Sequence, residues 1–251
     1  MDTLLLHSIR QLAGGRRLLL LLALAALPVG LAVIVSLALG EDETSNSQYL
    51  DTLLDGLLIG AVMPVIALVL ATAAFGNEVE DRTLNYLVLK PVPRYQIVFA
   101  KLLASLVIGC PLVVISGVAA TLIADGGIGA RLVELDSPLR AAAATGIALL
   151  LGSVTYSAAF TWAGLVSTRA LPYALVYVVL WEGVVSSFLG GVRYLSVRGY
   201  TLALVHGLDE GSFAELGDRV IEFPAALVGV AAVTAGFFLL AVRRLRDMDV
   251  P

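Results

Sequence analysis

Charged side chains between Phe75 and Lys101 have the types and the spacing for directional contacts with another protein. Acidic residues come first in this stretch and basic residues follow, with leucines and two prolines among them. Hydrogen bonds between ionised groups are strong and orient the two partners, so this pattern suits docking rather than catalysis. The alternative is that the basic residues only hold this loop on one side of a membrane. The docking residues that we expect are Glu78, Glu80, Asp81, Arg82, Thr83, Leu84, Lys90, Pro91 and Arg94.

Local signals predict a short helix inside this stretch. Gly76 can end a preceding helix. Asn77 suits an N-cap position, with Glu80 three residues later as its capping-box partner. The run Lys90 to Pro93 holds two prolines, which do not fit a helix interior. We therefore expect a short transverse helix over 78–89 between two long helices.

Glu182 is a second candidate, because it is the only ionisable residue well inside an apolar run long enough to cross a bilayer. Burying its charge there would cost at least a few kcal/mol, so the carboxyl group should face a cavity or a partner, or be protonated. Tyr173, Tyr177 and Trp181 recur every four residues on the same run, 171–190. Together with Glu182, these three aromatic side chains could line a pathway or a subunit interface. The alternatives are ordinary packing of the aromatic residues and a tilted or broken helix that leaves the carboxylate in a wet vestibule.

Catalytic chemistry finds little support among the remaining residues. No phosphate-binding motif G-x-x-x-x-G-K-[ST] occurs, and the glycines at 126–129 are not followed by lysine and serine or threonine. Ser153 lacks the G-x-S-x-G surroundings of a hydrolase, and neither His7 nor His206 lies in an apolar run. Cys110 is the single cysteine. We expect no catalytic residue and no metal site, which makes a membrane-embedded enzyme the least favoured class.

The elements that position these residues are helices that face lipid. The 251 residues are 59% hydrophobic and 14% charged, with a mean hydropathy of +0.94. Soluble domains are closer to half apolar and one quarter charged, and a bilayer core of about 30 Å takes roughly 20 helical residues per crossing. We expect an all-α membrane protein, one transmembrane domain over 1–251. Its predicted spans are about 18–40, 56–75, 102–124, 141–166, 171–190 and 224–242.

The distribution of lysine and arginine predicts the orientation of these spans. Eleven of the 16 basic residues fall on one side, which the positive-inside rule makes cytoplasmic, and the outer loop 41–55 holds five acids and no base. Both termini are then cytoplasmic, as an even number of spans requires. The inner residues are Arg10, Arg16, Arg17, Arg82, Lys90, Arg94, Lys101, Arg169, Arg243, Arg244 and Arg246, and the outer ones are Arg131, Arg140, Arg193, Arg198 and Arg219.

Two segments outside the spans also have helical character. Residues 1–17 place leucines and an isoleucine on one helical face, which predicts a helix in the cytoplasmic membrane interface; the alternative is a disordered leader. The external segment 191–223 contains the semi-apolar stretch Tyr200 to Leu208, too short to cross. That stretch is either a re-entrant or interfacial helix or part of an ordinary exposed loop.

The polar loop resembles the loop signature of ABC-2-type ATP-binding-cassette exporter permeases. Arg82 stands where that family often has glycine, and the interfacial helix, the six spans and the long outer segment resemble the family layout. The motif covers about 25 residues and the layout covers the whole chain. The matching residues are Glu78, Glu80, Thr83, Leu84, Leu87, Lys90, Pro91, Val92, Arg94 and Lys101.

This resemblance implies a membrane-spanning subunit that forms the substrate pathway as a dimer, with a second copy or a related permease. The helix at 78–89 would be a coupling helix that docks on a separate ATPase subunit, which would carry the ATP and magnesium; no cofactor is expected on this chain. The expected location is the plasma membrane of a prokaryote, in contact with lipid and with no nucleic-acid partner. The alternative is a standalone secondary transporter or channel that uses Glu182, although we find no convincing internal repeat of the kind such proteins often have.

Overall fold

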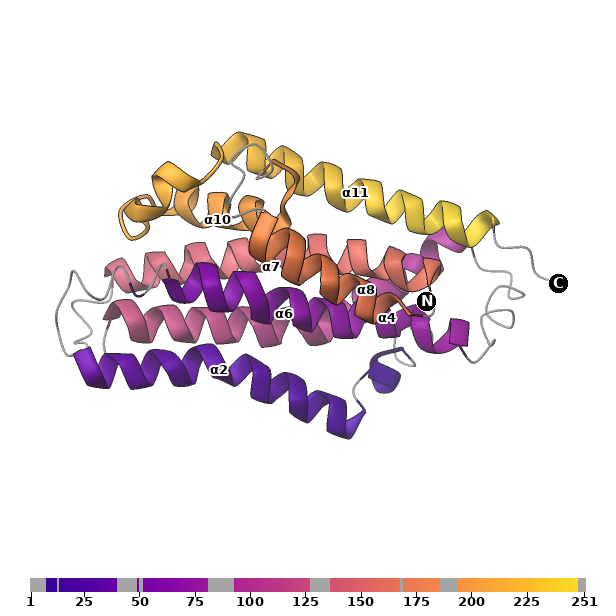
Figure 1. Ribbon diagram of the computed structural model, residues 1–251, viewed down its shortest axis with the longest axis horizontal. Coiled ribbons are helices and arrows are strands. Elements are labelled where there is room, and N and C mark those ends of the chain that lie inside the picture. Colours follow the sequence, from indigo (N-terminus) through magenta and orange to yellow (C-terminus); the bar gives the residue numbers. More distant parts are fainter. Residues whose placement is uncertain are drawn as a thin grey trace.

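The computed structural model describes residues 8–12, 14–39, 49, 52–80, 93–126, 136–167, 169–185 and 194–247, and in these ranges the regular structure is helical, with no strand. Two of the helices, η1 and η3, are π-helices, and η5 is a 3₁₀-helix. Figure 1 shows the helices as an elongated bundle. Their bounds are α2 Gly15–Leu39, η1 Leu53–Val62, α4 Met63–Glu80, α6 Arg94–Gly126, α7 Asp136–Val166, α8 Ala170–Val176, η3 Tyr177–Val185, α10 Val197–Leu208, η5 Ala214–Arg219 and α11 Phe223–Asp247.

Five stretches among the described residues are long and apolar enough to cross a membrane, in agreement with an all-α membrane fold. The apolar helix Ala170–Gly183, in the region of the predicted fifth span, is shorter, and residues 186–193 lie outside the described chain. The count of six spans therefore stays a prediction. The five long stretches are Gly15–Ala38, Leu53–Gly76, Arg94–Ala124, Asp136–Val166 and Phe223–Asp247.

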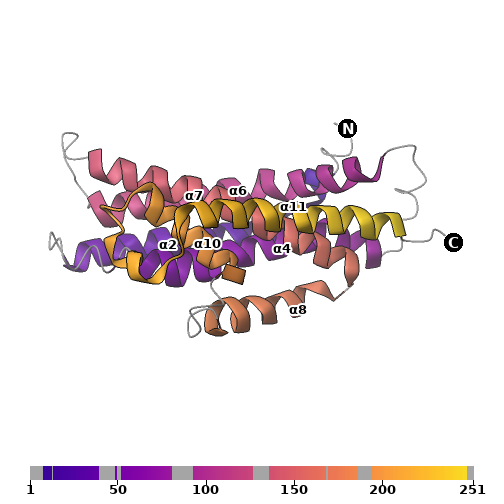
Figure 2. The same cartoon turned by 90° about the horizontal axis from the view of Figure 1, so that it is seen from above.

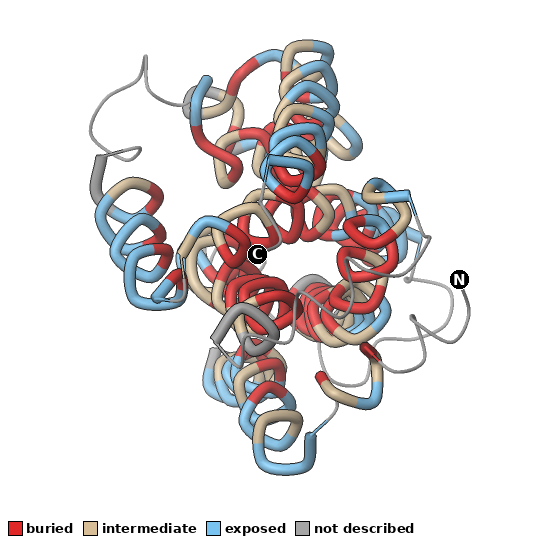
Figure 3. The backbone as a smooth tube through the Cα atoms, turned by 90° about the vertical axis from the view of Figure 1, so that its right-hand side faces the viewer, coloured by how far each residue is buried: buried red, intermediate tan, exposed pale blue. Residues whose placement is uncertain are grey.

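The middle of the bundle is formed by α7 and by the continuous helix of η1 and α4. These two are mostly buried, whereas α2 and α11 lie at the periphery and bury little of their apolar surface. Figure 3 shows buried residues facing the centre and exposed residues on the outer helices. The exposed side chains of α2 are largely leucines, such as Leu20, Leu27 and Leu37. Large apolar side chains on an outer surface are stable where lipid covers them, so this pattern fits a helix bundle in a bilayer.

Small residues allow α7 to approach its neighbours closely. At Gly164 an added Cβ atom would lie 2.9 Å from the carbonyl oxygen of Thr72 on α4, and at Gly152 it would lie 2.5 Å from the hydroxyl oxygen of Thr201 on α10. Helices in membranes associate largely through such close backbone packing, because lipid offers no hydrophobic drive between them. The two glycines therefore set how near α4 and α10 lie to the central helix.

The end of α4 departs from the sequence-based expectation. The helix does not stop at Gly76 but continues through Asn77 to Glu80, so Asn77 does not act as the N-cap of a separate helix there. A single glycine costs an α-helix only about 1 kcal/mol, which the surrounding turns can absorb. Residues 81–92, which hold most of the predicted transverse helix, lie outside the described residues.

The chain before the first long helix and the segment before the last one are both partly helical. Residues 8–12 are helical, and Gly14 separates them from α2. The helix α10 covers the semi-apolar stretch that begins at Tyr200, and one side of it is buried, which excludes an ordinary exposed loop there. Figures 1 and 2 both place the turn at 8–12 and the last residues of α11 at the same end of the bundle.

Candidate functional site

The first turn of α10 is built to receive an acidic group. Ser196 occupies the N-cap position in an extended conformation, and its hydroxyl oxygen accepts a hydrogen bond from the Gly199 amide at 3.0 Å. The amides of the next two residues, Val197 and Arg198, have no partner within the helix because they belong to its first turn. These two amides and the positive end of the helix dipole favour a carboxylate at this position.

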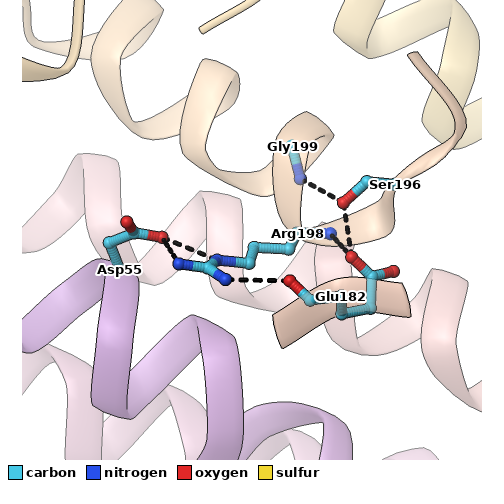
Figure 4. Close-up of polar contacts among 5 residues, drawn as sticks. All are labelled: Asp55, Glu182, Ser196, Arg198 and Gly199. Atoms are coloured by element: carbon cyan, nitrogen blue, oxygen red, sulfur yellow. Dashed lines mark hydrogen bonds and ion pairs between the residues drawn. The ribbon is translucent and has the colours of Figure 1, made fainter. Parts of the chain in front are cut away.

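Glu182, on η3, supplies that carboxylate. Its side chain is fully buried, and it accepts hydrogen bonds from the amide of Val197 at 3.1 Å and from the amide of Arg198 at 3.4 Å. The Ser196 hydroxyl also donates to it, and the Tyr177 hydroxyl donates at 3.3 Å. Figure 4 shows the carboxylate facing the start of α10. A side chain of η3 thus caps the N-terminus of α10, and the buried carboxylate is stabilised by donors from η3 and from the start of α10.

Arg198 links η3, which carries Glu182, to a third helix, η1. Its Nε donates to Asp55 Oδ1 at 2.7 Å, and its Nη2 lies 2.6 Å from the same oxygen. Its Nη1 donates to the backbone carbonyl oxygen of Glu182 at 2.9 Å. The side chains of Arg198 and Asp55 are only 14% and 29% exposed, so water screens this ion pair little. Asp55 lies on η1, and the guanidinium group therefore links η1, η3 and α10 (Figure 4).

Both acidic residues of this cluster lie on π-helices, which are rare and occur frequently at functional sites. On η1, an added Cβ atom at Gly60 would lie 2.7 Å from the carbonyl oxygen of Asp55 and 3.7 Å from Cζ of Arg198. Glycine at this position therefore accommodates the wide π-turn and the arginine together. Tyr200 completes the site: its hydroxyl donates to the carbonyl oxygen of Tyr194. Burial raises the pKa of Tyr200 and the charge of Glu182 raises it further, which keeps that hydroxyl protonated.

A buried basic residue of α6 lies beside the C-terminal end of α4. The Lys101 side chain, on α6, is 3% exposed, and its ammonium nitrogen lies 5.8 Å from the ring centre of Phe75 on α4, within the range of a cation–π contact. Phe75 also packs in an apolar cluster with Val98 of α6, Leu165 of α7 and Leu245 of α11. Four helices therefore meet where α4 ends and α6 begins. In the described part of the chain, no three His, Cys, Asp or Glu side chains gather as a metal site would require.

Comparison with known families decides what kind of protein carries these features. The family model described as "ABC-2 family transporter protein" matches residues 16–189, well over half of the 251 residues. This chain belongs to the ABC-2 transporter family. A search among curated proteins found no match. The matched region includes both the predicted docking segment and Glu182, while α10 with Arg198 follows it. The protein is therefore an ABC-2 permease, a multi-pass transport component of the membrane.

The docking residues predicted in this permease fall largely where the structure gives no description. Glu78 and Glu80 belong to the last turn of α4, but their side chains are outside the described set, as is the segment from Asp81 to Pro91. Arg94 is the first residue of α6. The docking role of this segment stays a prediction.

The pathway residues predicted in the permease segment 171–190 divide into two groups. Glu182 lies in the buried cluster, as does the Tyr177 hydroxyl, and the rings of Tyr177 and Trp181 stack with their centres 6.4 Å apart. The Trp181 indole donates to the carbonyl oxygen of Leu195 at 3.4 Å. Tyr173, in contrast, is 67% exposed. The pathway or interface role of the four residues stays a prediction.

Sequence reasoning missed three members of the cluster in the permease, namely Asp55, Ser196 and Arg198. Ser196 could have been found, because serine before a semi-apolar helical stretch is a typical N-cap signal. Arg198 was counted only as an outer basic residue, and Asp55 was assigned to the loop before the second span. Their pairing crosses 143 residues of sequence, and no local pattern predicts such a contact.

Proposed function

We propose that this permease is the membrane subunit of an ATP-driven exporter, working as a dimer with a second copy or a related permease and with a separate ATPase subunit. The observation that carries the proposal is the ABC-2 family match over residues 16–189. The proposed arrangement has six spans, of which 171–190 is the fifth, and both termini in the cytoplasm of a prokaryote. The excess of arginine and lysine on the side of the termini supports that orientation. Lipid surrounds the bundle, and no nucleic acid takes part.

The proposed contact with the ATPase is the segment from Glu78 to Arg94. Glu78 and Glu80 lie in the last turn of α4, and Arg94 is the first residue of α6, so any movement of the segment acts on both helices. At that end the Phe75 cluster connects α4 and α6 to α7 and α11. Close-packed interiors transmit displacement because they compress little. A push on the segment by the ATPase would therefore reach the centre of the bundle.

ATP and magnesium belong on the partner subunit in this proposal. The permease sequence contains no phosphate-binding loop with the lysine that such a loop needs. The chain's own contribution is to receive the movement and to shape the pathway, not to carry out chemistry.

The alternative, a secondary transporter that carries protons on Glu182, is less well supported by the geometry. A proton carrier must exchange its proton with water or with cargo, whereas this carboxylate is fully buried and accepts hydrogen bonds from two backbone amides and two hydroxyl groups. Donors of this kind hold the carboxylate in place. A structural or switching role for Glu182 agrees better with these contacts.

Co-purification tests the docking proposal directly. The tagged permease is extracted from its native membrane with a mild detergent, and mass spectrometry identifies any ATPase that has a phosphate-binding loop. We expect the double variant Glu78→Lys, Glu80→Lys to lose this ATPase, because the charge of the contact reverses. The matched control is Glu41→Lys, Glu43→Lys, which has the same spacing and the same charge change in the predicted outer loop. Equal ATPase recovery from both double variants would overturn the docking role.

A further inference from the structure

The helix from Ala170 to Val185 follows α7 after only three residues, 167–169, so its start is held by a short connection. Figure 2 shows α8 along the outside of the bundle. Most of its larger apolar side chains are exposed, among them Val176, Val179 and Leu180 at 54–55%. Within this chain, the helix therefore packs mainly through its one inward face.

That inward face is a stripe of small residues that ends in a carboxylate. Ala170, Ala174, Val178 and Glu182 follow one another at intervals of four residues, and all four are at most 7% exposed. Alanine and valine bury little surface, and in a membrane this contact gains nothing from the exclusion of water. The strongest attachment on this face is therefore the set of hydrogen bonds from α10 to Glu182.

The receiving site on α10 does not depend on Glu182 for its own position. α10 packs against α7 and α11, and the Arg198 guanidinium group is held independently by Asp55 on η1. If η3 moved away, Arg198 would still have its ion pair, and Ser196 would still cap the Gly199 amide. The contact can therefore break without dismantling α10, which is what a reversible closure requires.

We propose that Ala170–Val185 is a hinged arm and that Glu182 is the latch that closes its far end onto the first turn of α10. The hinge is the junction between the end of α7 and the start of α8. The closed arm is the state described in the structure, and in the open arm Glu182 gains water in place of the α10 donors. Release of the latch is a step of the transport cycle; this last point rests on the proposed function.

The distance between the arm and α11 shows whether the arm is closed or open. Spin labels are placed on Val179→Cys and Val228→Cys, which are 55% and 69% exposed, in a background in which Cys110, the single native cysteine, is replaced by serine. The full chain in lipid nanodiscs is then examined by pulsed dipolar EPR. We expect one short distance in the parent protein and a second, longer one in Glu182→Gln, with the open-to-closed ratio raised roughly 10- to 100-fold. Ser196→Ala, which removes one donor, should shift the ratio less and serves if Glu182→Gln does not fold.

Two controls separate a latch from a merely structural residue. Glu222→Gln changes an exposed glutamate at the start of α11 and should leave the distances unchanged. Gly146→Ala crowds Val118 of α6 at 3.0 Å, away from both the hinge and the latch, and should not produce the longer distance. An unchanged distance distribution in Glu182→Gln and Ser196→Ala would overturn the proposal, as would a longer distance that also arises in Gly146→Ala.

The complex of the permease with its ATPase tests whether release of the latch is a step of the transport cycle. Trapping with ATP, magnesium and vanadate should populate the longer distance in the parent protein. If the complex hydrolyses ATP while the arm stays closed in every trapped state, the latch is not part of the cycle and that point is overturned. If no ATPase accompanies the permease, the proposed function fails instead, and the measurements on the chain alone still decide whether the arm and its latch exist.

Discussion

The contact between Gly164 and Thr72 leads to a prediction about stability whose sign can be worked out from the packing. A Cβ atom at position 164 would lie 2.9 Å from the Thr72 carbonyl oxygen, 3.2 Å from its Cα and 3.4 Å from its carbonyl carbon. These are backbone atoms of α4, so no side-chain rotation can relieve the clash. In Gly164→Ala, α4 and α7 must move apart where both are buried.

The expected cost follows from two opposing effects. Inserting a methyl group into a packed interior costs about 1–3 kcal/mol. Alanine is favoured over glycine within a helix by roughly 1 kcal/mol, which offsets part of that cost. We therefore expect Gly164→Ala to lower the free energy of unfolding by up to about 2 kcal/mol. The matched control is Gly236→Ala on α11, where no atom lies within 4 Å of the added Cβ; this variant should gain about 0.5–1 kcal/mol.

Equilibrium unfolding by denaturant in detergent micelles, followed by circular dichroism, measures both variants under the same conditions. The prediction is the opposite sign of the two changes rather than either magnitude. A Gly164→Ala protein that is as stable as Gly236→Ala would refute the claim that backbone contact at this crossing limits the approach of α4 and α7.

Two further predictions concern the buried cluster. In a double-mutant cycle of Asp55→Asn and Arg198→Gln, we expect a coupling of about 1–3 kcal/mol in the free energy of unfolding, because the ion pair is mostly buried; strictly additive effects would contradict this. Tyr173→Phe should change stability by less than about 0.5 kcal/mol, because the Tyr173 side chain is 67% exposed. Tyr177→Phe should cost about 1 kcal/mol because its hydroxyl donates to Glu182, and equal stability of the two phenylalanine variants in the same denaturant titration would count against that hydrogen bond.

Local patterns predicted some parts of this permease well and failed at others for identifiable reasons. The long helices follow from apolar runs of the length that a bilayer requires, and five of them are present among the described residues. The stop predicted at Gly76 is wrong, because one glycine weakens a helix without ending it when the following residues can continue. The cap at Ser196 was readable in principle, but its significance depends on the carboxylate that meets it.

Glu182 shows where sequence and structure each contribute. An ionisable residue inside an apolar run must find compensation, so its special status was evident from the chain alone. What compensates it could not be read there, because the donors come from α10 and the adjoining Arg198 pairs with Asp55, 143 residues away.

The amino-acid sequence by itself determined that this chain is a helical membrane protein, and its polar loop pointed to the ABC-2 family. Hydrophobic length and charge placement are local properties, and they suffice for those conclusions. Only the tertiary structure decided that Asp55, Glu182 and Arg198 meet, and that Gly164 touches the backbone of α4. Such contacts depend on the relative position and rotation of helices, which many distant side chains set together and no short stretch of sequence specifies.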